Sequence, residues 1–284
     1  MKKIVVLGSG MVGRVMASDL STQFDVTAVD VSGLNLEKLG DSPAKRVVAD
    51  LSNPDTVSAL VRGFDLVVGA VPGFMGFSTL RSVIEAGKNV VDISFFPEDA
   101  FLLDELAKTR GVTAVVDCGV APGMSNMILG YHAARMAVSQ FTCYVGGLPF
   151  KREFPFEYKA PFSPADVIEE YTRPARYVEN GFVVVKPPLS DAELMDFEEV
   201  GTLEAFNSDG LRSLLKTVSV PNMIEKTLRY PGHAEHIKAL RDSGFFDREE
   251  IEVRGGKVRP IDVTSAVLFK RWHLGERDDE FTIM

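Results

Sequence analysis

The fold of this chain is decided by its opening stretch, Lys3-Ile4-Val5-Val6-Leu7-Gly8-Ser9-Gly10-Met11-Val12-Gly13. The run up to Leu7 predicts a buried strand, and the G-x-G-x-x-G spacing that follows predicts a tight turn into a helix. Gly10 would let the backbone approach a pyrophosphate, and the helix N-terminus would present free N–H groups to it. We therefore expect a dinucleotide-binding loop, with a glycine-rich turn that holds no ligand as the alternative. The loop residues are Gly8, Ser9, Gly10, Met11, Val12 and Gly13.

Strand-like runs, each almost continuously apolar, recur up to about residue 118. Strands that are buried on both faces have this pattern, which favours a parallel sheet covered by helices. The runs are Lys3–Leu7, Val26–Asp30, Arg46–Ala49, Leu66–Ala70, Asn89–Asp92 and Val112–Val116. Helical spacing of apolar residues occurs between them, in Met11–Leu20, Asp55–Val61, Phe77–Ala86 and Glu98–Thr109. Residues 1–123 are thus expected to form an α/β, Rossmann-type domain with a doubly wound parallel sheet.

From about residue 124 the helix-like and strand-like stretches no longer alternate regularly. Asn180-Gly181 lies between two β-rich arms and predicts a hairpin, because both residues tolerate the positive φ of a type I′ turn. The other expected elements are helices over Asn126–Ala137 and Gly232–Ser243, strands over Gln140–Val145 and Asn222–Tyr230, a connection over Pro149–Pro164 and a turn at Gly255-Gly256. Residues 124–284 are expected to form a mixed α+β domain for substrate binding and dimerisation.

The ends of three strand-like runs in the first domain supply further cofactor candidates. Asp30 ends the second run, where a carboxylate accepts hydrogen bonds from the ribose hydroxyls of an adenosine and repels a 2′-phosphate. The sequence therefore predicts NAD, with NADP less favoured. Ligands bind at the carboxyl ends of strands in such sheets, so Asp50-Leu51 and Val71-Pro72 are predicted to contact the cofactor too. Ordinary loop roles are the alternative for these four residues.

The composition excludes several classes of protein. With 31 basic and 40 acidic residues, the formal net charge of the chain is −9, and no window is basic enough to bind nucleic acid. No apolar run approaches the roughly 18 residues of a membrane span, and the N-terminus lacks a signal-peptide core, so we expect a cytoplasmic protein. Cys118 and Cys143 are too few for a disulfide framework or a four-ligand zinc site. The spacing of His233 and His236 invites a zinc interpretation, but without further Cys or His nearby we expect no metal.

The fifth and sixth strand-like runs end at Asp92 and at Asp117-Cys118, where the reaction is expected to occur. Cys118 could be a nucleophile. No His or Lys neighbours it in sequence to lower the pKa of its thiol, however, which favours a role as a small, buried apolar residue. Ser125 lacks the second glycine of a G-x-S-x-G elbow, which argues against an acyl-transfer hydrolase.

Three longer motifs carry a family resemblance. They are Asp117-Cys118-Gly119-Val120-Ala121-Pro122-Gly123-Met124-Ser125-Asn126, Tyr144-Val145-Gly146-Gly147-Leu148-Pro149 and Lys226-Thr227-Leu228-Arg229-Tyr230-Pro231-Gly232-His233-Ala234-Glu235. With them, the whole chain resembles the saccharopine dehydrogenase family, and within it the lysine 6-dehydrogenase-like branch of bacteria and archaea. The resemblance implies an NAD(P)-dependent oxidoreductase that oxidises a C–N bond of an amino acid and forms a homodimer or higher homo-oligomer.

The residue types fit that chemistry. Arg229 is the candidate for the substrate carboxylate, because a guanidinium binds carboxylate through two parallel N–H bonds, and an interdomain ion pair is the alternative. His233 is the candidate general base, since imidazole titrates near neutral pH, with a solvated or capping histidine as the alternative. Asp92 is the second catalytic candidate, and Tyr230 and Asn126 complete the predicted substrate contacts.

The choice of substrate depends on the stretch Glu204–Gly210, which matches another landmark of the family. Members that handle saccharopine have an Arg there, suited to a substrate with three carboxylates, whereas this chain has Asp209, with Arg212 only beyond Gly210. A carboxylate prefers an ammonium group, so a lysine-like amine is favoured over saccharopine; Asp209 could equally be the N-cap of a helix over Gly210–Leu215. A nucleotide-binding or redox-sensing protein without turnover is the alternative from another functional class.

The length of the chain also bears on the resemblance. In the family the chain continues beyond the stretch that matches Arg277-Asp278-Asp279-Glu280-Phe281-Thr282-Ile283-Met284 and returns to the nucleotide domain. We therefore expect a C-terminally shortened chain with an unpaired sheet edge and an exposed patch.

Overall fold

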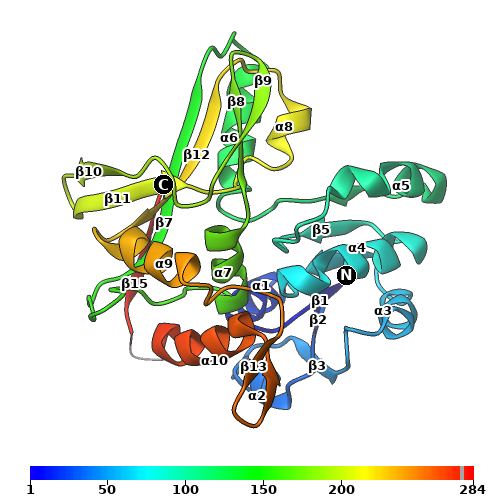
Figure 1. Cartoon of the computed structure of the whole chain (residues 1–284). Coiled ribbons are helices and arrows are strands. Elements are labelled where there is room, and N and C mark those ends of the chain that lie inside the picture. The colour runs from blue at the N-terminus through cyan, green and yellow to red at the C-terminus, as the bar shows by residue number, and fades with distance from the viewer. Residues whose placement is uncertain (276–277) are drawn as a thin grey trace. The chain divides into compact units, whose positions relative to one another are not determined.

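The computed structural model of the chain describes residues 1–275 and 278–284. Arg277, the first residue of the C-terminal stretch quoted above, lies outside the described residues. The chain divides into two compact units, Met1–Met124 and Ser125–Met284 (Figure 1).

Unit 1 is built on a six-stranded parallel sheet in the order β3-β2-β1-β4-β5-β6. Its strands are β1 (Lys3–Leu7), β2 (Asp25–Asp30), β3 (Lys45–Val48), β4 (Leu66–Gly69), β5 (Val90–Asp92) and β6 (Ala114–Val115). Its helices are α1 (Met11–Leu20), α2 (Gly33–Glu37), α3 (Pro54–Val61), α4 (Gly73–Glu85), the 3₁₀ helix η1 (Ala100–Leu103) and α5 (Asp104–Arg110). This order reverses direction between β1 and β4, the switch point of a doubly wound sheet. The predicted Rossmann-type fold is confirmed.

Alternate residues of the strands pack on opposite helical layers, because successive side chains of a strand point to opposite faces. Val5 and Leu7 of β1 join the core formed with α3 and α4, whereas Ile4 and Val6 join the core formed with α1 and α2. Burial on both faces explains the continuous apolar runs in the sequence. The short helix α2 was not expected from the sequence; it begins where the Ser32 side chain accepts a hydrogen bond from the Asn35 N–H.

Unit 2 contains a mixed sheet in the order β10-β11-β12-β7-β15, with the β8–β9 hairpin paired to β12. Its strands are β7 (Phe141–Pro149), β8 (Ala175–Glu179), β9 (Phe182–Lys186), β10 (Glu193–Phe197), β11 (Gly201–Asn207), β12 (Met223–Arg229) and β15 (Glu280–Ile283), with β13 (Ile251–Val253) and β14 (Gly256–Val258) in a separate hairpin. Its helices are α6 (Met124–Ala133), α7 (Pro164–Thr172), α8 (Leu214–Thr217), α9 (His233–Asp242) and α10 (Pro260–Trp272). The predicted mixed α+β architecture is confirmed, and the turn at Asn180-Gly181 has the expected positive φ at both residues.

The helices α7, α9 and α10 pack on one face of this sheet, around Phe206, Tyr171 and Trp272. Neither α7 nor α10 was expected from the sequence. At one edge of the sheet, β15 pairs antiparallel with β7, and in the described part of the chain β7 is the one strand that pairs with it.

Candidate functional site

The glycine loop of unit 1 has the backbone geometry that its sequence predicts. Gly8 has a φ of +100°, and a Cβ there would lie 2.4 Å from the Ala70 carbonyl oxygen. A Cβ on Gly13 would lie 2.1 Å from the Gly8 oxygen, so this glycine is required for close packing of helix and strand. A Cβ on Gly10, in contrast, would meet no atom within 4 Å. Other atoms of the protein therefore fill the space beside Gly8 and Gly13, whereas the space in front of Gly10 is open.

The residues around this open space fit a phosphate-bearing ligand. Helix α1 begins after Gly10, and no side chain caps its N-terminus, so its first N–H groups and its positive dipole end are available to an anion. The Ser9 hydroxyl is buried and has no hydrogen-bond partner in the described part of the chain. A buried hydroxyl without a partner is costly, and a bound polar group would satisfy it. These observations fit the pyrophosphate of a dinucleotide.

Asp30 fixes this loop from within the protein. One of its carboxylate oxygens accepts a hydrogen bond from the Ser9 N–H at 2.8 Å, and the other accepts one from the Ser32 N–H at 2.8 Å. The Asn35 side-chain amide adds a third contact at 3.3 Å. Much of the hydrogen-bonding capacity of Asp30 thus holds the β1–α1 and β2–α2 turns together.

The other predicted cofactor residues occupy two further strand ends. The Asp50 carboxylate accepts hydrogen bonds from the Ser52 N–H and hydroxyl, which lower its pKa. Leu51 and Val71 are buried in the core of unit 1, and Pro72 is the residue that precedes α4. Met11 and Val12 form the start of α1 and are partly exposed. Contact of these residues with a cofactor stays a prediction.

Acidic groups gather at the ends of β5 and β6. The Asp92 carboxylate accepts hydrogen bonds from the Ser94 N–H at 2.8 Å and the Ser94 hydroxyl at 3.2 Å. The Cys118 N–H donates to the Asp92 carbonyl oxygen at 3.1 Å. Burial, together with the charges of Asp117 and Asp92, raises the pKa of the Cys118 thiol. A thiol kept protonated is a poor nucleophile, which agrees with the argument from the sequence against a nucleophilic Cys118, although the side chain is partly rather than fully buried.

Arg229 lies in a buried cluster of unit 2. Its guanidinium is 2% exposed and forms an ion pair of 2.8 Å with Glu170. It also donates to the Tyr171 hydroxyl at 3.2 Å and lies 4.4 Å from the centre of the Tyr158 ring. Burial raises the pKa of Glu170, and the charge of Arg229 opposes that rise. These contacts give Arg229 a structural role, so the predicted binding of a substrate carboxylate finds no support in the geometry.

His233 belongs to the same cluster and is held neutral. Its Nδ1 lies 2.8 Å from the Phe156 carbonyl oxygen, to which it donates, and its Nε2 lies 2.9 Å from the Tyr171 hydroxyl, from which it accepts. Burial and the nearby charge of Arg229 lower the pKa of His233 to about 3. An imidazole with both nitrogens engaged in a dry core does not take a proton from a substrate in this arrangement. The structure therefore does not support the predicted general base.

The remaining substrate candidates also have partners within unit 2. Asp209 is 2% exposed, and its carboxylate forms two hydrogen bonds with the Arg176 guanidinium, at 2.8 and 2.7 Å. Helix α8 begins only at Leu214, so Asp209 does not cap it. The side-chain amide of Asn126 donates to the Ser213 hydroxyl at 3.1 Å, and the Tyr230 hydroxyl donates to the Pro149 carbonyl oxygen at 2.9 Å.

Sequence reasoning missed the partners of these residues. Glu170 and Tyr171 lie on α7, whose apolar spacing at Val167, Ile168 and Tyr171 could have indicated a helix. No sequence signal, however, links Glu170 to Arg229, or Arg176 to Asp209. In the described residues, no group of three or more His, Cys, Asp or Glu side chains is arranged to hold a metal ion. No helix among residues 1–275 and 278–284 is long and apolar enough to cross a membrane.

Comparison with known proteins covers both units. Residues 4–115 match the model of the saccharopine dehydrogenase NADP binding domain, and residues 119–284 match that of the saccharopine dehydrogenase C-terminal domain. The chain belongs to the saccharopine dehydrogenase family. The predicted family is thus confirmed, whereas the lysine 6-dehydrogenase-like branch stays a prediction.

The individual relatives described below are less than 30% identical to this chain in sequence. A saccharopine dehydrogenase (NADP⁺, L-glutamate-forming) of Pyricularia oryzae is 27% identical over 265 residues, which cover 88% of this chain and 59% of the relative. A carboxyaminopropylagmatine dehydrogenase of Synechocystis is 23% identical, covering 94% of this chain and 72% of that protein. The apo saccharopine dehydrogenase structure of Saccharomyces cerevisiae has a TM-score of 0.67 at 23% identity, covering 89% of this chain and 60% of that one, and shows the shared fold. The chain spans about 60% of the length of these fungal relatives.

The predicted preference for NAD is wrong. The matching family model describes an NADP-binding domain, and the fungal relatives are NADP⁺-dependent enzymes. The prediction rested on the charge of Asp30, but both oxygens of that carboxylate accept hydrogen bonds from the backbone of unit 1 itself. An acidic residue that holds the loop together is a weaker sign of nucleotide preference than one that projects toward a ribose.

Proposed function

We propose that this chain is an NADP-dependent oxidoreductase that acts on the C–N bond of an amino acid or an amino-acid-derived amine. Membership of the saccharopine dehydrogenase family in both units supports this activity. The observation that supports binding of NADP is the glycine loop. There an uncapped helix N-terminus, open space at Gly10 and a Ser9 hydroxyl without a hydrogen-bond partner in the described part of the chain occur together.

Different residues of unit 1 would contact the dinucleotide and hold the binding loop in place. The first N–H groups of α1 and the Ser9 hydroxyl would hold the pyrophosphate of the dinucleotide, and Asp30 would keep the loop in place. Bound NADP supplies the hydride acceptor for oxidation of the amine-bearing carbon to an imine, which water then hydrolyses to a carbonyl compound and a free amine. Asp92 is our candidate for the acid–base group, because it is the last residue of β5, at the carboxyl edge of the sheet where ligands of such folds bind. Like His233 it is buried in this structure, at 1% exposed with its carboxylate hydrogen-bonded to Ser94, so this role rests on its position alone.

The ion pair between Asp209 and Arg176 changes the order in which substrates should be tested. The preference for a lysine-like amine depended on a free carboxylate at Asp209, and in the structure that carboxylate is compensated by a guanidinium. The argument against saccharopine therefore loses its physical basis. We propose saccharopine as the first substrate to test and lysine as the second.

The test is turnover by the full chain, followed through nicotinamide absorbance. NADP⁺ is supplied with saccharopine, lysine or other amino acids, and the reverse reaction is run with NADPH. Gly10→Ala should weaken NADPH binding at least about tenfold without loss of stability, because its Cβ enters the space in front of the helix. Gly63→Ala is the matched control, since its Cβ also meets nothing within 4 Å but lies outside the loop.

Three outcomes separate the alternatives. Turnover of saccharopine or lysine with NADP⁺ supports the proposal and ranks the substrates. NADPH binding without turnover of any amine supports the alternative of a nucleotide-binding protein without activity. A chain that binds no NADPH, or whose binding is unchanged by Gly10→Ala, contradicts the assignment of the loop.

A further inference from the structure

An NADP site in unit 1 needs a positive charge that the β2–α2 turn does not supply. NADP differs from NAD by a phosphate on the 2′-oxygen of the adenosine ribose, which in this fold lies beside the end of the second strand, where an Arg can accommodate the phosphate. Residues 31–36, which follow Asp30, contain no Lys or Arg. Ser32 and Asn35 offer polar groups in this turn, but neither side chain is charged. A cation for a 2′-phosphate therefore has to come from another element.

Most basic side chains of the first three strands and their connections are engaged or lie elsewhere. These side chains are Lys2, Lys3, Arg14, Lys38, Lys45 and Arg46. Lys45 forms an ion pair of 2.7 Å with Asp25, and Arg46 donates to the Gly40 carbonyl oxygen. The two lysines at the N-terminus lie where β1 begins, at the amino edge of the sheet, whereas ligands bind at the carboxyl edge. Lys38 follows the last residue of α2, at the end of that helix away from the turn.

Arg14 lies in the first turns of α1, close to the glycine loop. Its backbone N–H donates to the Gly10 carbonyl oxygen at 3.1 Å, so the two residues lie one turn apart on the same side of the helix. Side chains of a helix tilt toward its N-terminus, which directs the Arg14 side chain toward the open space in front of Gly10. Four residues of helix span about 6 Å along the axis, a distance that an extended arginine side chain covers.

The flank of α1 that carries Arg14 faces the β2–β3 side of the sheet. Ser21, seven residues and nearly two turns further on, lies on the same flank. Its hydroxyl is hydrogen-bonded at 3.2 Å to that of Ser42, which lies in the connection from α2 to β3. At the start of the helix, the Gly8 N–H donates to the Val29 carbonyl oxygen of β2 at 2.8 Å, so the glycine loop lies beside the end of β2. Arg14 is thus directed toward the region between the glycine loop and the β2–α2 turn.

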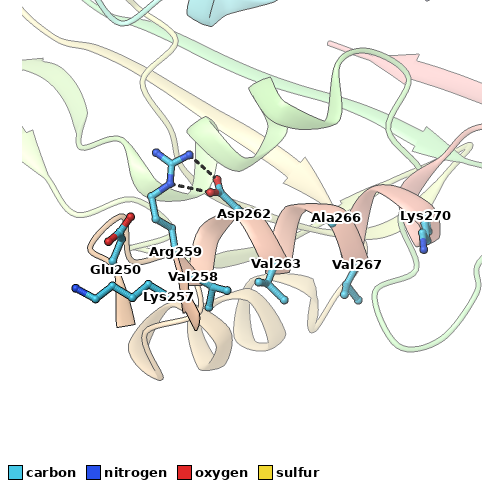
Figure 2. A pocket seen from close by; sticks show the side chains of 9 residues that line it. All are labelled: Glu250, Lys257, Val258, Arg259, Asp262, Val263, Ala266, Val267 and Lys270. Atoms are coloured by element: carbon cyan, nitrogen blue, oxygen red, sulfur yellow. Dashed lines mark hydrogen bonds and ion pairs between the residues drawn. The ribbon is translucent and has the colours of Figure 1, made fainter. Parts of the chain in front are cut away.

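The Arg14 guanidinium is not compensated within the described part of the chain. It forms no hydrogen bond, ion pair or aromatic contact there, and the residue is partly exposed. Arg259 of unit 2 shows the opposite case, because it donates two hydrogen bonds to Asp262, at 2.7 and 3.1 Å (Figure 2). A planar guanidinium binds two oxygens of a phosphate through parallel N–H bonds. The position and the charge of Arg14 therefore both suit a phosphate on the adenosine ribose.

We propose that Arg14 binds the 2′-phosphate of NADP and thereby sets the preference of this chain for NADP over NAD. This assignment rests on the proposed nucleotide-binding function of unit 1. It accounts for the use of NADP beside an acidic residue. The Asp30 carboxylate is already hydrogen-bonded to two backbone N–H groups and to the Asn35 amide, and the charge of Arg14 offsets its remaining repulsion of a phosphate.

The test is binding of NADPH and NADH to the full chain, followed by nicotinamide fluorescence. Arg14→Ala should raise the Kd for NADPH by about 10- to 100-fold and that for NADH by no more than about threefold, because only NADPH carries the 2′-phosphate. Arg14→Lys should raise the Kd for NADPH less, since an ammonium keeps the charge without the paired N–H bonds. Alanine is a good helix former, and circular dichroism melting checks that unit 1 stays folded.

Adenosine fragments isolate the 2′-phosphate from the rest of the dinucleotide. In the wild type, 2′,5′-ADP should displace NADPH more effectively than 5′-AMP does, and Arg14→Ala should remove this advantage. Added salt should also reduce it, because screening weakens partly exposed charge pairs. Arg62→Ala is the matched control, since it removes the same side chain from an exposed position at the C-terminal end of α3 and should leave both Kd values unchanged.

Several results would overturn the proposal. A chain that binds neither nucleotide contradicts the nucleotide-binding function itself, whereas the other results leave that function standing. A wild type that binds NADH more tightly than NADPH removes the preference. Equal losses of NADPH and NADH affinity in Arg14→Ala place Arg14 at the pyrophosphate, which both nucleotides share, and unchanged binding excludes it from the site. A selective loss of NADPH affinity in Lys38→Ala in place of Arg14→Ala assigns the phosphate to the end of α2.

Discussion

Acidification should destabilise unit 2 through His233. The pKa of this side chain is lowered from 6.5 to about 3 by burial and by the charge of Arg229. Between about pH 6.5 and pH 3, His233 is therefore protonated in the unfolded chain and neutral in the folded chain. The stability that this site contributes is present above pH 6.5 and is lost as the pH falls toward 3. At about 1.4 kcal/mol per unit of pKa, the loss on going from neutral pH to about pH 4.5 is about 2 to 3 kcal/mol.

The nearby carboxyl group of Glu170 acts in the opposite direction. Burial raises its pKa, so uptake of a proton there favours the folded state as the pH falls. The contribution of His233 is therefore isolated by comparing the wild type with His233→Gln, which cannot titrate at this position.

Trp272 provides the readout, because it is the one tryptophan of the chain and its ring centre lies 6.4 Å from that of His233. Urea unfolding followed by its fluorescence should show that His233→Gln loses about 2 to 3 kcal/mol less than the wild type between neutral pH and about pH 4.5. His236→Gln, at an exposed histidine one turn away, removes only the smallest of the causes that lower the pKa of His233, so most of the wild-type pH dependence should remain. Equal losses in the wild type and His233→Gln would refute the neutral, buried state of His233.

Three further predictions follow from particular contacts. Arg229→Met removes the ion pair of Glu170, whose side chain is 18% exposed, and should lower the free energy of unfolding of unit 2 by about 2 to 4 kcal/mol, seen in the urea midpoint of Trp fluorescence; an unchanged midpoint with a raised KM would favour a substrate role. Gly13→Ala should destabilise unit 1, because its Cβ would meet the Gly8 oxygen, whereas Gly10→Ala should spare stability and lower NADPH affinity, as circular dichroism melts and nucleotide titration would show. Asp209→Asn should cost about 1 to 3 kcal/mol and leave the ratio of saccharopine to lysine turnover unchanged; a shifted ratio would restore its substrate role.

The nucleotide-binding loop of unit 1 could be predicted from the sequence because its sequence signals are local. The turn, the helix start and the three glycines lie within a few residues, and each glycine has a backbone reason that spacing alone conveys. The nucleotide preference failed because it depended on where the Asp30 carboxylate points. That direction is set by two N–H groups: that of Ser9, which the pairing of β1 with β2 brings to Asp30, and that of Ser32 in the turn directly after β2.

The predicted substrate-binding and catalytic residues of unit 2 stay predictions that the geometry does not support, for the same kind of reason on a longer scale. Arg229 and His233 have the residue types that the chemistry needs, but residue type does not report burial. Glu170 precedes Arg229 by 59 positions and reaches it only because α7 packs on the same face of the sheet as α9 and α10.

By itself, the sequence determined the family, the doubly wound sheet and the glycine loop, since these depend on apolar runs and on backbone conformations that particular residues permit. Tertiary structure alone decided which charged side chains are compensated in the core and which face solvent. Compensation depends on atoms that come within about 3 Å of each other from distant parts of the chain, and packing places them there. The same packing turned Trp272 inward and left Val263 and Val267 of that helix on the surface.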